Sequence, residues 1–124
     1  MGTFVISQRL SGLYKYEFTS RKGKTIFTSN DFELRFEAEE EILRLKVMIE
    51  SVVFMRFRSS RGKFYFKIIL DKCEVAKSRQ YTTQLLMQKG VDEILRTLAV
   101  SEILDFSSSD EIFPSAEEVF SSNE

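Results

Sequence analysis

Two stretches of this sequence, fifty residues apart, carry the same strand pattern. "SGLYKYEF" occupies residues 11–18 and "RGKFYFKI" occupies residues 61–68. In both, a glycine precedes aromatic or aliphatic residues at every second position, which is the alternation of a half-buried antiparallel strand. A chain of 124 residues that carries one strand pattern twice is predicted to contain two copies of one small unit.

The register between the two copies changes where a turn is predicted. Through the strand that ends at residue 18 the offset is 50, and beyond the next turn it is 49, so that Ile26 matches Val75 and Ser29 matches Ser78. Turns tolerate such a deletion, whereas a one-residue slip within a strand would move every side chain to the opposite face of the sheet. The place of the deletion therefore supports a repeat of structural origin.

Each copy is predicted to fold as three strands followed by a helix, because short alternating segments precede a longer segment with apolar residues three and four apart. Asn30 or Asp31 is expected to cap the first helix. Gly90 within the second helix indicates close packing, since Gly in a helix otherwise costs about 1 kcal/mol against Ala. The predicted strands are 3–10, 13–18, 24–29, 52–60, 63–70 and 73–78, and the predicted helices are about 32–52 and 82–100.

The strand near residues 53–59 can be aligned in two ways. Counting back from the glycine of the second copy would turn Phe54 and Arg56 toward the core. Hydrophobic alternation instead favours Met55 and Phe57 toward the core, with a turn one residue shorter. Because the first alignment turns a charged side chain inward, the sequence predicts the second.

Three strands and one amphipathic helix bury too little apolar surface to be stable alone, so the two copies are predicted to share one sheet. We expect an α+β fold with a single antiparallel sheet and both helices packed on one of its faces. The predicted domain covers residues 1–106, with units of about 3–53 and 54–106, and residues 107–124 form a tail outside it.

The order F-x-I, then G-x-Y-x-F, then G-x-x-I-x-x-S-x-x-[FY] and a helix resembles the YegP-like family of small bacterial proteins. The resemblance covers about residues 3–106. The sequence departs from the family pattern at Lys72, where a turn glycine is expected, in its degenerate second F-x-I, and in its extra tail. The residues that carry the pattern are Phe4, Ile6, Gly12, Tyr14, Tyr16, Gly23, Ile26, Ser29 and Phe32, and then Gly62, Phe64, Phe66, Val75, Ser78 and Tyr81.

The resemblance implies tandem β3-α-β units in one antiparallel sheet, with each helix followed by a strand that is exchanged with the other unit. On this basis "VVFMRF" after the first helix and "EILDF" at residues 102–106 after the second are the exchanged strands. The molecular function of the family is uncharacterised, so the resemblance implies an architecture and no chemistry.

The composition excludes several kinds of active site. The sequence has no histidine, which excludes serine-type triads, histidine acid–base catalysis and histidine-containing metal sites. Cys73 has no second cysteine to pair with and is interpreted as an inert thiol. The glutamates between residues 37 and 41 are interpreted as a solvated helix face rather than a cation site. We therefore expect no enzyme activity, no catalytic residue, no metal and no cofactor.

The charge is unevenly distributed although the net charge is only −1. Residues 51–80 contain eight basic and two acidic residues, a net charge of +6. A nucleic-acid partner is disfavoured by the near-zero total charge, and because Phe64 and Phe66 are expected to face the helices, where they cannot stack on bases. The alternative is that these residues form a solvated outer face of the sheet. The candidate residues for an anionic ligand or a nucleic acid, called the basic strip below, are Arg56, Arg58, Lys63 and Lys67.

The tail at residues 107–124 is rich in serine and carries five acidic residues and no basic one. This composition favours a flexible tail. Phe113 and Phe120 are nevertheless too apolar for a segment that only increases solubility. The sharper hypothesis is that they dock on the basic strip of the same chain or on a partner.

The sequence as a whole predicts a cytoplasmic protein, since no segment resembles a signal peptide or has the length of a membrane span. The leading hypothesis is a non-enzymatic interaction or structural module. Its partner would be an unidentified protein or a second copy joined at an open sheet edge. The alternative is a weak binder of nucleic acid or an anionic ligand through the basic strip.

Overall fold

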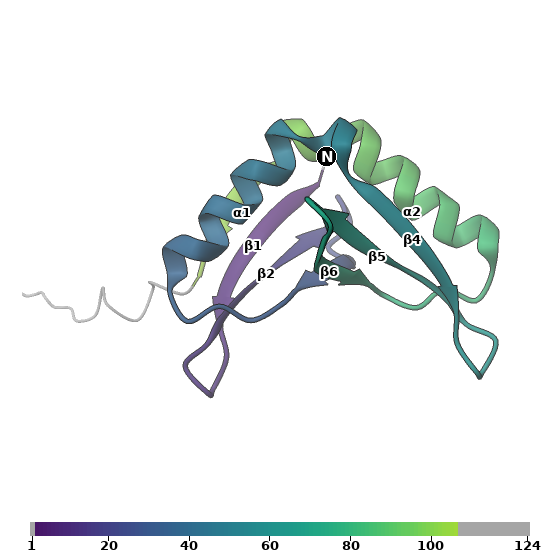
Figure 1. Ribbon diagram of the computed structural model, residues 1–124, viewed down its shortest axis with the longest axis horizontal. Helices are drawn as coiled ribbons and strands as arrows, with labels where there is room; N and C mark the ends of the chain where they lie inside the picture. The colour runs from purple at the N-terminus through teal and green to yellow at the C-terminus, as the bar shows by residue number, and fades with distance from the viewer. Residues whose placement is uncertain (1, 107–124) are drawn as a thin grey trace, which may run out of the picture.

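Alternating apolar residues produce the strands of this protein, and two longer amphipathic segments produce the helices that cover them. The computed structural model describes residues 2–106, which form a seven-stranded sheet with two α-helices on one face, as the sequence predicts. Figure 1 shows the sheet as an arch, with α1 over its first half and α2 over its second half. The elements are β1 (Thr3–Gln8), β2 (Tyr14–Thr19), β3 (Thr25–Ser29), α1 (Arg35–Val47), η1 (Ile49–Ser51), β4 (Val53–Arg58), β5 (Phe64–Leu70), β6 (Cys73–Ser78), α2 (Gln84–Thr97), η2 (Leu98–Val100) and β7 (Glu102–Asp105).

The strand order is β4-β5-β6-β3-β2-β1-β7, so the two halves meet at the middle of the sheet through β3 and β6. The strand after the second helix, β7, pairs with β1 of the first half, as the exchange of strands requires. One pair differs from the antiparallel prediction: β7 lies parallel to β1, while the other five neighbouring pairs are antiparallel. The chain reaches β7 through α2, and a strand that returns through a helical crossover can lie parallel to its neighbour.

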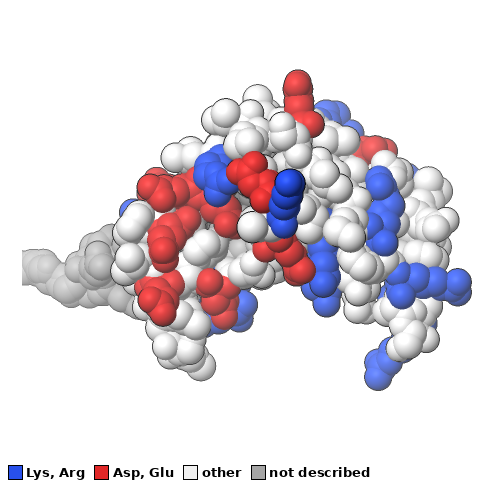
Figure 2. Space-filling view, in the orientation of Figure 1, with Lys and Arg blue, Asp and Glu red and all other residues white. Residues whose placement is uncertain are grey.

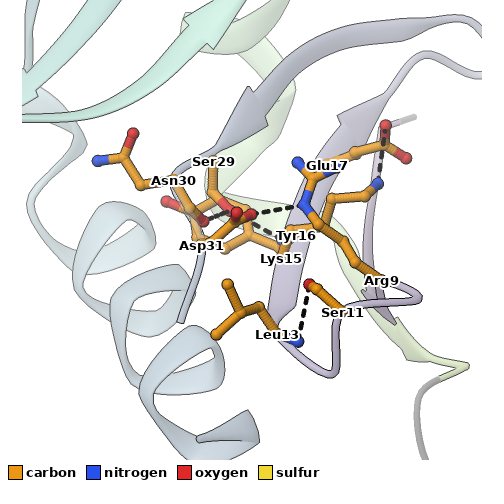
Figure 3. Close-up of polar contacts among 9 residues, drawn as sticks. All are labelled: Arg9, Ser11, Leu13, Lys15, Tyr16, Glu17, Ser29, Asn30 and Asp31. Carbon is orange, nitrogen blue, oxygen red and sulfur yellow. Dashed lines mark hydrogen bonds and ion pairs between the residues drawn. The ribbon is translucent and has the colours of Figure 1, made fainter. Parts of the chain in front are cut away.

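The two halves use a serine in the same way beside the central β3–β6 pair. The Oγ of Ser29 accepts a hydrogen bond from the N–H of Tyr16 at 2.9 Å (Figure 3). The Oγ of Ser78 accepts the same bond from the N–H of Phe66, also at 2.9 Å. Each hydroxyl therefore satisfies a strand N–H that would otherwise lack an acceptor near the end of the ladder.

One hydrophobic core extends through both halves, between the helices and the sheet. In the first half the ring centroids of Phe4 and Phe18 lie 4.9 Å apart. In the second half the ring of Phe66 lies 5.6 Å from that of Phe54 and 6.5 Å from that of Tyr81. The apolar residues three and four apart in the second predicted helix form its buried face, since Met87, Val91, Ile94 and Leu98 are all buried.

Both α-helices are shorter than predicted, because each is followed by a tighter 3-10 turn, η1 or η2. The prediction that Asn30 or Asp31 caps α1 was wrong. Asn30 donates its side-chain N–H to the backbone oxygen of Glu74 at 2.8 Å, which joins the two halves. Asp31 accepts a hydrogen bond from Arg9 at 2.6 Å (Figure 3). By contrast, the start of α2 has a side-chain cap, the hydroxyl of Thr83.

The turn between β5 and β6 is the place where the offset between the two similar sequence stretches falls from 50 to 49. Only Asp71 and Lys72 lie between these strands, with φ angles of +52° and +67°. A two-residue turn with both φ angles positive matches the twist of an antiparallel hairpin. The close packing predicted at Gly90 is also confirmed, since a Cβ there would lie 2.5 Å from the hydroxyl oxygen of Tyr81.

The prediction that Met55 and Phe57 face the core was wrong. The register between β4 and β5 points Phe54 toward the helices, where it packs on the core. Arg56 lies on the same side, and its guanidinium donates to the side-chain oxygen of Gln88 in α2 at 2.9 Å. An arginine is tolerated there because β4 is the last strand of the sheet, so that the charged end of the side chain reaches solvent.

Candidate functional site

Strand β4 occupies the positions of two different strands of the first half of the sheet. It precedes β5 as β1 precedes β2, and it follows α1 as β7 follows α2. In the first half, β1 has β2 on one side and β7 on the other. In the second half, β4 pairs with β5 and ends the sheet, so within residues 2–106 no strand lies along its other edge. The open edge of β4 therefore corresponds to the edge of β1 that β7 covers.

The backbone of this open edge has the groups that an added strand needs. Phe66 directs its N–H to Ser78 at 2.9 Å, so it does not bond to Arg56, the residue opposite it on β4. Arg56 consequently points its N–H and C=O toward the open edge. In the first half, the corresponding carbonyl is that of Ile6, which accepts a hydrogen bond from the N–H of Phe106 at 2.8 Å. The edge of β4 thus repeats the arrangement with which β1 holds β7.

A groove of about 380 Å³ lies beside this edge, between β4 and α2. The groove residues Arg56 and Arg58 correspond to Ile6 and Gln8 of β1, and in the first half β7 covers this part of β1 as far as Asp105, which pairs with Ile6. The groove is therefore the space that lies open where the second half has no strand equivalent to β7. Its lining combines apolar and basic side chains, namely Arg56, Phe57, Arg58, Phe64, Gln84 and Met87.

Two arginines make this groove basic. The guanidinium of Arg56 bonds to Gln88, and the guanidinium of Arg58 lies 5.6 Å from the ring centroid of Phe64. Neither arginine forms an ion pair within the part of the chain that the structure describes. Figure 2 shows acidic side chains gathered over α1 and basic side chains toward the β4 end of the molecule. The groove is therefore suited to a ligand with negative charge.

The structure divides the basic strip between two faces of the sheet. Arg56 and Arg58 lie on the helix side, in the groove. Lys67 lies on the outer face, where it forms an ion pair with Glu74 at 3.3 Å. Lys63 lies in the turn that precedes β5. The four residues therefore do not form one continuous surface for a phosphate backbone.

An aromatic pair on the outer face was missed by the sequence reasoning. Phe57 stacks on Tyr65, with ring centroids 5.2 Å apart. The ammonium groups of Lys67 and Lys77 lie over these rings, at 5.3 Å from the first and 4.8 Å from the second. The lysines thus compete for the aromatic faces that a nucleobase would use for stacking. Counting back from Gly62, instead of relying on alternation, would have placed Phe57 on this face.

Several other candidate features are placed as follows. The docking residues predicted in the tail, Phe113 and Phe120, lie outside the described residues. Cys73 is exposed. Within residues 2–106, no group of three or more acidic or cysteine side chains is arranged to hold a metal ion. No helix of that same region is long and apolar enough to cross a membrane.

One ionisable pair, the buried Tyr16 and the partly buried Glu41, joins β2 to α1 in the first half. The Tyr16 hydroxyl donates to the Glu41 carboxylate at 2.5 Å. Burial raises the pKa of Glu41, while the hydrogen bond from Tyr16 and the guanidinium of Arg44 oppose this rise. Burial also raises the pKa of Tyr16 well above its usual value, and the negative charge of Glu41 adds to the rise. The corresponding residues of the second half are Phe66 and Gly90, so the pair belongs to the first half alone.

Replacing Tyr16 with Phe is expected to raise the pKa of Glu41 further and to reduce the free energy of unfolding by about 1–3 kcal/mol. The folded-state pKa of Glu41 already lies above its unfolded value, so this group favours the folded state at low pH and less so as pH rises through the folded pKa. Without the Tyr16 hydroxyl, the buried carboxylate becomes costlier when ionised. The loss should therefore be largest near pH 7 and smallest below about pH 4, where Glu41 is protonated in both states.

Chemical denaturation of the Tyr16→Phe variant across this pH range measures the effect, and NMR titration of Glu41 measures the pKa. Glu41→Gln is the matched control, since an amide oxygen can still accept from Tyr16 but does not titrate. A loss of the same size at every pH, or an unchanged pKa of Glu41, would contradict this account.

The geometry defines a class of protein: an α+β fold with one antiparallel-rich seven-stranded sheet, two helices on one face, and an open basic edge at β4. A solved structure of YegP from E. coli, a protein of unknown function, has this fold at a TM-score of 0.77 and 21% identity, covering 86% of this chain and 93% of that one. A UPF0339 protein of Shewanella oneidensis has it at a TM-score of 0.80 and 17% identity, covering 90% and 96%.

These similarities confirm the predicted YegP-like resemblance at the level of the fold. No protein-family model and no curated protein matches the sequence. Because YegP is itself a protein of unknown function, the similarity establishes an architecture and no activity.

Proposed function

We propose that this chain is a non-enzymatic interaction module, built from two tandem copies of one unit, whose binding surface is the open edge of β4 with the groove beside it. Its ligand is an extended acidic segment that adds as a strand parallel to β4. The observation that carries the proposal is β7, which lies parallel to β1 at the position that stays open beside β4. Strand addition to an exposed sheet edge is a common mode of peptide recognition.

Backbone pairing and side-chain burial both contribute to this binding. The added strand pairs with the N–H and C=O of Arg56, as β7 pairs with Ile6. An apolar side chain of the ligand, in the register of Ile103, lies beside Phe54 and covers the core there, as Ile103 covers the core of the first half. Burying one such side chain contributes about 1.5–3 kcal/mol.

The arginines of β4 favour an acidic ligand over a neutral one. In the first half, Arg35 at the start of α1 holds Asp105 of β7 at 2.7 Å, so an acid–base contact already accompanies strand addition in this fold. Gln84 takes the place of Arg35 at the start of α2. In the second half the positive charge comes from Arg56 and Arg58 on the strand instead.

Weak binding of nucleic acid or another anionic ligand on the outer face is the second candidate. The observation in its favour is the group of Lys67 and Lys77 beside Phe57 and Tyr65. Binding dominated by phosphate contacts falls steeply with salt concentration, whereas pairing of a strand with β4 falls less because backbone bonds and apolar burial remain. Salt dependence therefore separates the two candidates.

We also propose that this is a bacterial, cytoplasmic protein. The similar structures come from E. coli and Shewanella oneidensis, which supports a bacterial source. The exposed free thiol of Cys73 is typical of a reducing compartment.

The test is binding of a synthetic peptide with the sequence of residues 101–106, the strand that occupies the equivalent position on β1. In the full chain labelled with ¹⁵N, the peptide is expected to shift the amide signals of β4 and of the start of α2. Arg56→Pro removes the edge N–H and should weaken binding about tenfold more than Arg56→Ala, which removes the side chain alone.

If Arg56→Pro does not fold, the amide shifts that the peptide causes in the wild-type chain still show where the peptide binds. Shifts confined to the outer face, with binding of a single-stranded oligonucleotide that is lost on raising the salt, would transfer the function to the second candidate. An unchanged spectrum at millimolar peptide would remove strand addition at β4.

A further inference from the structure

The tail contains a short copy of the strand that already fills the equivalent position. Residues 110–113 read Asp-Glu-Ile-Phe, and residues 101–104, which lead into and form most of β7, read Ser-Glu-Ile-Leu. The acidic residue and the isoleucine recur at an offset of nine. We infer that residues 110–115 of one copy of the chain add as an eighth strand, parallel to β4, to a second copy. This inference rests on the proposed function and names its ligand.

The register of β7 on β1 places the side chains of the tail on β4. Ile103 pairs with Phe4, whose counterpart on β4 is Phe54. Ile112 therefore lies beside Phe54 on the helix side of the sheet, next to the groove that begins at Arg56. Leu104 pairs with Val5 on the outer face, so its counterpart Phe113 lies on that face beside Met55, the counterpart of Val5. Both apolar residues of the tail segment thus meet apolar residues of β4.

Pro114 is compatible with this register. In a parallel pair only every second residue donates its N–H to the neighbouring strand. Phe106 makes such a bond to Ile6, so residue 105, the counterpart of position 114, is not one of the residues that donate to β1. A proline, which has no N–H, is accepted at a position of this kind.

Charge supports the same placement. In this register Pro114 lies beside Arg56, and residue 116 lies beside Arg58. Glu117 and Glu118 follow directly, and the tail as a whole has five acidic residues and no basic one. Two carboxylates therefore come next to the end of the groove where two arginines lack an ion pair within residues 2–106.

The length of the chain assigns the segment to a second copy. β4 and β7 lie at opposite edges of the sheet, six strand spacings apart, which is about 29 Å measured along the arched sheet at roughly 4.8 Å a spacing. Ile112 is six residues beyond Phe106, and six extended residues span at most about 22 Å. The short connection therefore favours the β4 edge of a second copy as the site that the segment occupies.

The test is the association of the full chain, measured by sedimentation over a range of concentrations at low and physiological salt. The wild type is expected to associate. The double variant I112D/F113D should weaken the association at least tenfold. V119D/F120D is the matched control, because it makes the same change in the same tail but outside the proposed strand, and it should leave the association within about twofold. Charge reversal gives a second measurement: R56E/R58E should weaken association, and adding E117R/E118R should restore part of it.

Three results would overturn the inference. The first is a wild type that stays monomeric at millimolar concentration. The second is an association that survives I112D/F113D. The third is one that V119D/F120D abolishes equally. If the peptide of residues 101–106 binds β4 while the full chain stays monomeric, the proposed function stands and its ligand is another protein. If that peptide does not bind and the chain does not associate, both proposals fail.

Discussion

Residues 1–60 expressed alone are expected to show no cooperative thermal transition as a monomer. This fragment lacks β7, which covers β1, and it lacks β6, which pairs with β3. It also loses the contact in which Lys46 of α1 donates to the backbone oxygen of Ser101. Removing these elements exposes one edge of β1 and one edge of β3, and it leaves β4 without its partner strand β5. We expect the whole folding free energy, about 5–15 kcal/mol for a domain, to be lost.

Circular dichroism and calorimetry of the fragment, with sedimentation to establish its oligomeric state, measure this outcome. Residues 1–106 are the matched control, since they keep every described strand and helix. That control should melt cooperatively. A monomeric fragment with a sharp transition would show that one unit can bury its own apolar face, and shared burial would then not be the cause of the repeat.

The sequence predicted the fold best where burial leaves little choice. The offsets of 50 and 49 placed Ser29 and Ser78 at equivalent positions, and both hydroxyls make the same hydrogen bond. Tyr16 and Phe66 are fully buried and alternate with half-buried residues, because one face of each central strand lies under a helix and the other does not. In such strands a change of register would bury charge, so the pattern of residues and the structure agree.

The prediction failed at β4 for a physical reason. Hydrophobic and polar residues must alternate along a strand only when one of its faces is buried along its whole length. The last strand of a sheet is not buried in this way. Arg56 therefore takes the helix side without losing access to solvent, while Phe57 takes the outer face and stacks on Tyr65. The position of β4 at the edge of the sheet therefore explains both its ambiguous sequence pattern and its open edge.

The candidate site was only partly predictable. Arg56 and Arg58 were named from local charge, but their place in a groove depends on strand order, which no local pattern contains. Gln84 and Met87 were not singled out as site residues, because they come from a helix that meets β4 only through the tertiary fold. The parallel position of β7, on which the proposed function rests, likewise follows from the connection through α2.

Phe66→Ala is expected to reduce the free energy of unfolding by about 3–5 kcal/mol. The Phe66 side chain is fully buried, and its ring contacts those of Phe54 and Tyr81, so its removal leaves a cavity in the middle of the second half. Tyr65→Ala is the matched control on the same strand. Tyr65 lies half-buried on the outer face, and its loss should cost about 0.5–1.5 kcal/mol, mainly through the stacking on Phe57.

Urea denaturation of both variants, with comparison of midpoints at unchanged slope, measures the two losses. The difference between them tests which face of β5 lies under the helices. Equal losses would mean that the sheet is covered on both faces, whereas a larger loss for Tyr65→Ala would mean that its alternation is reversed. In the first case the outer face of β4 and β5 would be an interface in solution. The edge of β4 would then be only part of the surface through which the molecule associates.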